Sequence, residues 1–250
     1  MNAASRELCV GILGGLGPEA TLDFFARILA ATPAQSDQDH LHLIIENNPK
    51  VPDRHAAIRG DGPDVTPALV TMAQNLERCG ADFVVMPCNT AHAFQPQIEA
   101  ALTIPFVSMV DEVVRHLKNT AARQAVGLMA AHGCMEADLY QSRLPDAGCE
   151  VITWRETEVT HFMDLVYRIK AGERGEQIET PLLELARSLL QRGADCLLAA
   201  CTEIPLILSP QVLSQQNFDC RFISTTDILV QRTLAYARNE IPLVNPATSV

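Results

Sequence analysis

The sequence predicts an α/β protein made of two similar halves, each a parallel sheet flanked by helices, with a functional site in the cleft between them. Two observations support this prediction. Short apolar runs alternate with helix-like segments, which is the order typical of a parallel sheet covered on both faces. The same series of features then starts again near the middle of the chain, which indicates a duplicated half-domain.

The first half contains four predicted strands. The apolar run at 8–15, LCVGILGG, is closed by glycines and predicts a buried strand. The runs HLHLIIENN, ADFVVMP and IPFVSMV have a similar apolar character and predict strands at 40–48, 81–87 and 104–110.

Helices are predicted between these strands. Pro18 and Glu19 suit the first turn of a helix that follows the first strand. The 3.6-residue period of the apolar residues predicts the buried face of that helix, formed by Leu22, Phe25, Ile28 and Leu29. A second helix is predicted over 65–80, where the pattern ends at a glycine.

The second half repeats features of the first. Residues 124–133, QAVGLMAAHG, have the glycine and apolar spacing of CVGILGGLG, with Gly127 and Gly133 in the places of Gly11 and Gly17. Further on, RGADCLLAACT repeats RCGADFVVMPCNT. In both stretches a Gly-Ala-Asp triplet enters an apolar run, and a cysteine follows at the same distance from the glycine. Two copies of one ancestral half explain this agreement.

The domain boundary is predicted in the polar stretch 116–124. The predicted domains are 1–117 together with 224–250, and 118–223. The last helical segment, TTDILVQRTLAYARN, is expected to return and pack on the first half.

Composition excludes several classes of function. The chain has 250 residues, a formal net charge of -11 and no basic segment, so nucleic acid and anionic membrane are not expected partners. No run reaches the roughly 18 to 20 apolar residues of a membrane span, and MNAASRELCV lacks the pattern of a signal peptide. A cytoplasmic protein is expected, with its eight cysteines reduced.

Two cysteines stand at equivalent positions of the two halves. Cys88 and Cys201 each follow a buried strand, where ligands of parallel sheets bind. If the halves face each other, the cleft presents one thiol from each side. Such a pair can remove a proton from one face of a bound molecule and return it to the other, which inverts a stereocentre. The residues after each cysteine have helix-starting character, and a helix N-terminus would stabilise a thiolate.

The motif spacings disfavour two other chemistries. A zinc site made of Cys88, His92, Cys196 and Cys201 is disfavoured because the spacings lack the tight two-residue knuckle. The glycine-rich stretch GGLGPEAT lacks the full spacing of a dinucleotide-binding loop. The sequence therefore predicts neither a metal nor an organic cofactor.

Four stretches resemble the aspartate/glutamate racemase family, within the Asp/Glu/hydantoin racemase superfamily. They are GGLGPEAT at 14–21, PDR at 52–54, CNTAH at 88–92 and CTEIPL at 201–206. The resemblance covers nearly the whole chain. It implies two flavodoxin-like domains, a cofactor-independent racemase of aspartate or glutamate, and a homodimer.

The resemblance also assigns roles to residues. Cys88 and Cys201 would be the opposed acid/base groups. Residues expected to bind the acidic amino acid are Leu16, Arg54, Asn89, Thr90, Lys170, Thr202 and Glu203, with support from Asn47, His92 and Gly133. A planar guanidinium at Arg54 suits a carboxylate, and Lys170 would assist it. The residues alone also allow that Arg54 caps a loop and that Lys170 is a solvated helix residue.

The second half departs from the family pattern in ways that affect the substrate more than the reaction type. Ala131 and Cys134 stand where relatives often have threonines, and Ser224 stands where an aspartate is often found. Two alternatives therefore stay open. One is a related enzyme on another small diacid or a hydantoin, such as a maleate-type isomerase or a hydantoin racemase. The other is a non-catalytic binder of an acidic metabolite.

Overall fold

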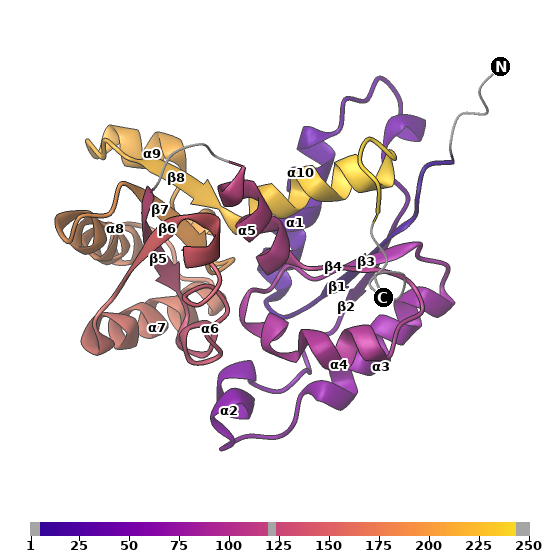
Figure 1. The fold of residues 1–250 in the computed structure, drawn as a ribbon, viewed down its shortest axis with the longest axis horizontal. Helices are drawn as coiled ribbons and strands as arrows, with labels where there is room; N and C mark the ends of the chain where they lie inside the picture. Colours follow the sequence, from indigo (N-terminus) through magenta and orange to yellow (C-terminus); the bar gives the residue numbers. More distant parts are fainter. Residues whose placement is uncertain (1–5, 120–123, 244–250) are drawn as a thin grey trace.

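The protein contains two parallel four-stranded sheets, each flanked by helices (Figure 1). The computed structural model describes residues 6–119 and 124–243. The strand orders are β2-β1-β3-β4 and β6-β5-β7-β8, so the two sheets have the same topology. The predicted fold class of two flavodoxin-like halves is confirmed.

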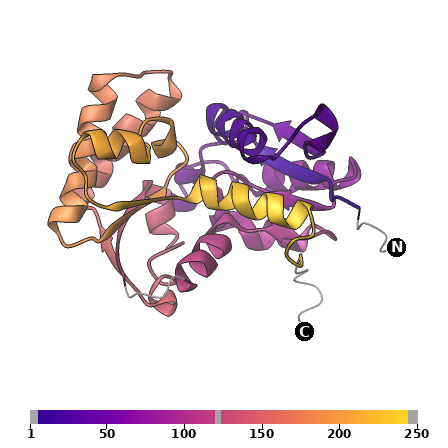
Figure 2. The ribbon, with the colours of Figure 1, turned by 90° about the horizontal axis from the view of Figure 1, so that it is seen from above.

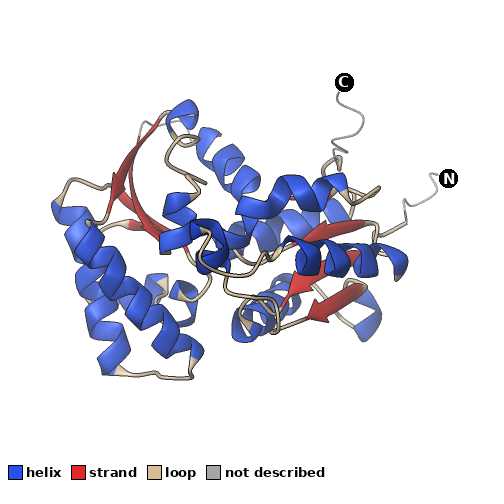
Figure 3. Ribbon diagram, turned by 90° about the horizontal axis from the view of Figure 1, so that it is seen from below, coloured by secondary structure: helices blue, strands red, loops and turns tan. Residues whose placement is uncertain are grey.

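The first sheet and its helices occupy the chain up to residue 118. Its strands are β1 (Val10–Gly14), β2 (Leu43–Asn47), β3 (Phe83–Val85) and β4 (Phe106–Val107). The helices are α1 (Pro18–Ala31), α2 (Arg54–Arg59), α3 (Thr66–Arg78), α4 (Gln95–Ala100) and α5 (Met109–Lys118). Central strands β1 and β3 are buried along their whole length, because helices cover both faces of the sheet (Figure 3).

The second half has the same plan. Its strands are β5 (Gln124–Ala130), β6 (Cys149–Thr153), β7 (Cys196–Ala200) and β8 (Arg221–Ser224). The helices are α6 (His132–Glu136), α7 (Glu156–Lys170), α8 (Glu176–Gln191), α9 (Pro210–Gln215) and α10 (Thr225–Ala237). Neither edge strand, β6 nor β8, was predicted from the sequence.

The duplicated residues occupy equivalent positions. A Cβ on Gly11 would lie 3.1 Å from the Cβ of Leu76 on α3, and a Cβ on Gly127 would lie 3.1 Å from that of Leu189 on α8. The two glycines therefore allow the same close approach of strand and helix in both halves. Asp82 likewise accepts a hydrogen bond from the Cys9 amide at 2.7 Å, and Asp195 accepts one from the Ala125 amide at 2.9 Å.

Two predictions about single elements were wrong in detail. The buried face of α1 consists of Ala20, Thr21, Phe24 and Ile28, whereas Leu22 is 65% exposed. The predicted face was displaced because Phe24 and Phe25 are adjacent and only Phe24 points into the core. The predicted strand at 104–110 stops at Val107, since the Ser108 hydroxyl accepts a hydrogen bond from the Asp111 amide at 3.2 Å and starts α5.

Helix α10 connects the two halves. It begins directly after β8 of the second sheet and packs against α1 and α5 of the first half, as expected for this segment (Figure 2). The Ser224 hydroxyl caps α10 by accepting a hydrogen bond from the Asp227 amide at 3.1 Å. The proposed division into domains is compatible with this path. Residues 120–123 of the predicted boundary stretch, and the ends 1–5 and 244–250, lie outside the described residues.

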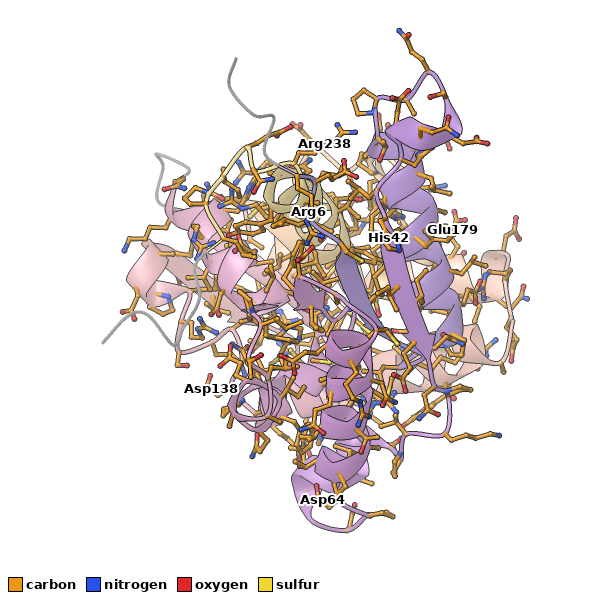
Figure 4. The ribbon with its side chains drawn as sticks, turned by 90° about the vertical axis from the view of Figure 1, so that its right-hand side faces the viewer. Arg6, His42, Asp64, Asp138, Glu179 and Arg238 are labelled. Carbon is orange, nitrogen blue, oxygen red and sulfur yellow. The ribbon has the colours of Figure 1, made fainter. Side chains whose placement is uncertain are left out.

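The outer surface carries exposed acidic side chains. Asp64, before α3, and Asp138, after α6, are exposed at the periphery (Figure 4). All eight cysteines have free thiols. Over residues 6–119 and 124–243, no helix has the length and apolar character needed to cross a membrane.

Candidate active site

A cavity of about 320 Å³ lies between the two halves, beyond the carboxyl ends of β1 and β7. This volume suits a small ligand. The loop from β1 to α1, the segment before α2, the end of α7 and the loop after β7 form its wall. The polar and charged lining residues are Glu19, Arg54, Lys170 and Glu203, and the first loop adds Gly15 and Gly17.

Cys201 follows β7 and lies behind the cavity wall. Its Sγ donates a hydrogen bond to Oε2 of Glu203 at 3.0 Å, and the Thr202 hydroxyl donates to the same oxygen at 3.3 Å. Cys201 is 6% exposed. Burial, and then the negative charge of Glu203, raise the pKa of the Cys201 thiol well above its usual value. In this structure Cys201 is therefore a thiol that needs a base to become a thiolate.

Lys170 ends α7 and pairs with the same glutamate. Its Nζ lies 3.4 Å from Oε1 of Glu203. Burial lowers the pKa of Lys170, but the charges of Glu203, Cys201 and Cys88 outweigh it and raise the pKa above its usual value. Lys170 therefore lies within electrostatic reach of both cysteines.

Cys88 follows β3 and is 7% exposed. Its Sγ lies 3.7 Å from the carbonyl oxygen of Leu16. The Arg54 guanidinium donates to this same carbonyl at 2.8 Å and to the carbonyl of Pro52 at 2.9 Å. Leu16 thus takes part through its backbone, and Arg54 lines the cavity while it holds the β1–α1 loop in place.

The residues after Cys88 hold the two halves together. The Asn89 amide donates to the Thr225 hydroxyl at 3.0 Å and accepts from the Tyr140 hydroxyl at 2.6 Å. Thr90 is also buried. They begin a short 3₁₀ helix, Thr90–Phe94, in place of the α-helix expected there. A second 3₁₀ helix, Ile204–Leu206, follows Cys201.

His92 acts on the backbone of Cys88, not on its thiol. Its Nε2 accepts a hydrogen bond from the Met109 amide at 3.0 Å, so its Nδ1 carries the proton and donates to the Cys88 carbonyl at 2.8 Å. Burial lowers the pKa of His92 to about 4, which keeps the ring neutral. Both ring nitrogens are engaged, which removes His92 from the zinc alternative. Among the described residues, no cluster of three or more His, Cys, Asp or Glu side chains is placed to hold a metal ion.

His55 was not predicted, although it directly follows Arg54 in the PDR stretch. Its Nδ1 accepts a hydrogen bond from the Gly133 amide at 3.0 Å. A Cβ on residue 133 would lie 2.7 Å from this nitrogen, so the glycine allows the contact. Burial lowers the pKa of His55 to about 4. The pair joins α2 of the first half to α6 of the second.

The sequence pattern of the Asp/Glu/Hydantoin racemase family matches residues 13–233. The chain belongs to this family. The predicted family, and with it the racemase class of enzyme, is confirmed. The broad specificity amino-acid racemase RacX of Bacillus subtilis is 27% identical over 208 residues, which cover 80% of this chain and 87% of RacX.

Solved racemase structures have the same fold. The Picrophilus torridus aspartate racemase aligns with a TM-score of 0.78 and 26% identity, over 92% of this chain and 94% of that one. The glutamate racemase isoform RacE1 of Bacillus anthracis aligns with a TM-score of 0.68 and 17% identity, over 97% and 85% of the two chains, which shows the fold alone.

Several positions of this family member lie away from the cavity. Asn47 lines a separate surface pocket beside Leu22 and Phe25. The three departures from the family pattern have structural surroundings: Ala131 precedes α6, Cys134 is fully buried in the core and Ser224 caps α10. Burial raises the pKa of Cys134, so this thiol is protonated.

Proposed function

We propose that this racemase acts on an acidic amino acid, first of all aspartate, and that Cys88 and Cys201 are its two acid/base groups. The observation that carries the proposal is the equivalent position of the two cysteines, Cys88 after β3 and Cys201 after β7. One thiolate takes the α-proton from one face, and the opposite thiol returns a proton to the other face. The side chains of the protein carry these protons, so the proposal uses no organic cofactor.

Positive charge in the cavity supports an acidic substrate. Arg54 and Lys170 line the cavity and are its cationic residues among those described. A guanidinium or ammonium group placed at a carboxylate also stabilises the negative charge that develops when the α-carbon loses its proton. We therefore assign the substrate carboxylates to Arg54 and Lys170, with Thr202 and Thr90 beside the α-carbon.

Proton NMR in deuterated water tests this proposal. With L-aspartate, the wild-type protein is expected to replace the α-proton by deuterium and to form D-aspartate. Cys88→Ser and Cys201→Ser are each expected to lower racemisation by at least about 100-fold, because each removes one member of the acid/base pair. Exchange that survives unchanged in both variants would exclude the two-thiol mechanism. An absence of exchange with both aspartate and glutamate would exclude the proposed substrates.

A broader amino-acid substrate range is the second candidate, and one observation favours it. Glu19 and Glu203 line the same cavity, so two carboxylates balance the two cationic residues. RacX, a relative of this chain, is named as a broad specificity racemase. The same NMR assay with alanine, arginine and lysine separates the candidates, since only a broad racemase exchanges the α-protons of all three. We also propose that the protein is cytoplasmic and forms a homodimer. Sedimentation measurements test the homodimer.

A further inference from the structure

Glu203 touches both a candidate catalytic thiol and a candidate substrate-binding cation. It is 4% exposed, and its two carboxylate oxygens face different partners. Oε2 accepts from the Cys201 thiol at 3.0 Å, and Oε1 lies 3.4 Å from the Lys170 ammonium. The carboxylate therefore occupies, beside Lys170, the place that a substrate carboxylate requires.

Lys170 is the ion-pair partner of Glu203, and its ammonium group balances the carboxylate charge as long as the pair is intact. If a substrate carboxylate takes over Lys170, Glu203 is left buried without its ion-pair partner. The nearest proton is on the Cys201 sulfur, already hydrogen-bonded to Oε2.

We propose that Glu203 is the proton acceptor that activates Cys201, and that binding of the substrate carboxylate to Lys170 triggers the transfer. The S–H bond of Cys201 breaks, its electron pair stays on Sγ, and an O–H bond forms at Oε2. No electrons are exchanged with a co-reactant. Lys170 then faces the new thiolate as well as the substrate carboxylate. This inference rests on the proposed racemase function of the same cavity.

Within the described part of the chain, no carboxylate accepts a hydrogen bond from the Cys88 thiol. The hydrogen-bond partner of its thiol is the Leu16 carbonyl, which cannot take up a proton. The two halves are duplicated, but Asn89 and Thr90 follow the first cysteine where Thr202 and Glu203 follow the second. The proposed activation therefore applies to one of the two thiols, and it predicts an asymmetry between the enantiomers.

Gly17 provides the space for this carboxylate. A Cβ on Gly17 would lie 2.9 Å from Oε1 of Glu203. The backbone of Gly17 is extended, so alanine fits it without strain. Gly17→Ala is therefore expected to displace the carboxylate from Lys170 with little loss of stability, and it serves as a second variant that leaves Glu203 in the chain.

The direct test measures thiolate formation without turnover. Succinate, a dicarboxylate without an α-amino group, is added at neutral pH while the ultraviolet absorbance of thiolate is recorded. We expect a gain of up to one thiolate per chain in the wild type and in Cys88→Ser. The gain is expected to vanish in Cys201→Ser, which identifies the thiol, and in Glu203→Gln. Glu173→Gln, which changes an exposed carboxylate paired with Arg168, is the matched control and should keep the gain.

The kinetic test uses the expected asymmetry. In Glu203→Gln, racemisation is expected to fall about 100-fold or more. The primary isotope effect on kcat/KM with α-deuterated substrate should rise for the enantiomer that Cys201 deprotonates and should not rise for the other. Glu203→Asp should recover part of the rate. A purely structural role for Glu203 would alter both isotope effects alike.

Failure of the inference and failure of the proposed function are distinguishable. A thiolate gain that persists in Glu203→Gln, or no gain in the folded and reduced wild type, overturns the role of Glu203 even if the wild type racemises aspartate. A wild type that gains the thiolate but exchanges no amino-acid α-proton supports the proton transfer and overturns the proposed function.

Discussion

Two buried glutamates, Glu112 and Glu203, have different sets of hydrogen-bond donors. Glu112 accepts hydrogen bonds from Arg115, Arg232 and the Tyr236 hydroxyl, so three donors hold one charge in a fixed place. Glu203 instead has one cation, Lys170 at 3.4 Å, and two weaker donors, the Cys201 thiol and the Thr202 hydroxyl. Glu112 is therefore held by three strong donors, whereas Glu203 has a single ion-pair partner to lose.

His92 makes stability depend on pH. Its pKa lies near 4 in the folded protein and near 6.5 when unfolded, so the unfolded chain binds more protons between these values. The contribution of the neutral His92 ring to the free energy of unfolding is fully present above pH 6.5. It is lost as the pH falls towards 4, by up to about 3 kcal/mol. The groups that act on the ring from its surroundings are Asp111, which raises the pKa, and Arg143, which lowers it.

Urea unfolding at a series of pH values between 7.5 and 4.5 measures this contribution. His92→Gln keeps a donor and an acceptor but cannot titrate, so its stability should fall less steeply than that of the wild type. The dependence that remains includes His55, whose pKa burial also lowers to about 4. The exposed His161→Gln is the control and should follow the wild-type curve. Parallel curves for wild type and His92→Gln would contradict the assignment.

At the scale of elements, helix α10 depends on a buried ionic cluster. Arg232 on α10 donates through Nε to Glu112 on α5 at 2.5 Å, and Tyr236 donates its hydroxyl to the same carboxylate at 2.8 Å. Arg232→Met is expected to cost about 2 kcal/mol, because it leaves a buried carboxylate with fewer donors. The double variant with Glu112→Gln should regain part of this loss, which urea unfolding measures.

A matched control lies on the same helix. Arg238 at the end of α10 makes one long hydrogen bond, 3.4 Å, to the Asp39 carbonyl. Arg238→Met should therefore change the free energy of unfolding by no more than about 0.5 kcal/mol. Additive losses in the Arg232 and Glu112 double variant would show that the two side chains are not coupled.

Elements with a strong apolar pattern were predictable, and those defined by distant contacts were not. The central strands β1, β3, β5 and β7 are continuous apolar runs, so the sequence alone located them. The edge strands β6 and β8 are half-exposed and mixed in composition, and they were missed. For the candidate site, the internal repeat predicted Cys88 and Cys201. His55 and Tyr140 were not predictable, because their hydrogen-bond partners, Gly133 and Asn89, lie 78 and 51 residues away in the sequence.

At the scale of the whole molecule, duplication produced two halves that are no longer independent. Helix α10 starts in the second sheet and packs on the first half. Beside the site, Asn89 is hydrogen-bonded to Tyr140 and Thr225, and His55 to Gly133. Because these contacts are buried and lie next to the cysteines, opening of the interface would disturb the site and the cores together.

Unfolding is therefore expected to be one cooperative transition, and the single Trp154 makes this measurable. Trp154 is 5% exposed and donates through Nε1 to the Leu185 carbonyl at 2.9 Å, so its fluorescence reports on the second half alone. Far-UV circular dichroism reports on both halves. In urea the two signals should change with the same midpoint.

Tyr140→Phe removes the hydroxyl bond to Asn89 and should lower both midpoints together, by about 1 kcal/mol or more in free energy. A fluorescence midpoint that moves apart from the dichroism midpoint, in the wild type or in this variant, would mean that the second half unfolds alone and that the contacts beside the site do not couple the two cores.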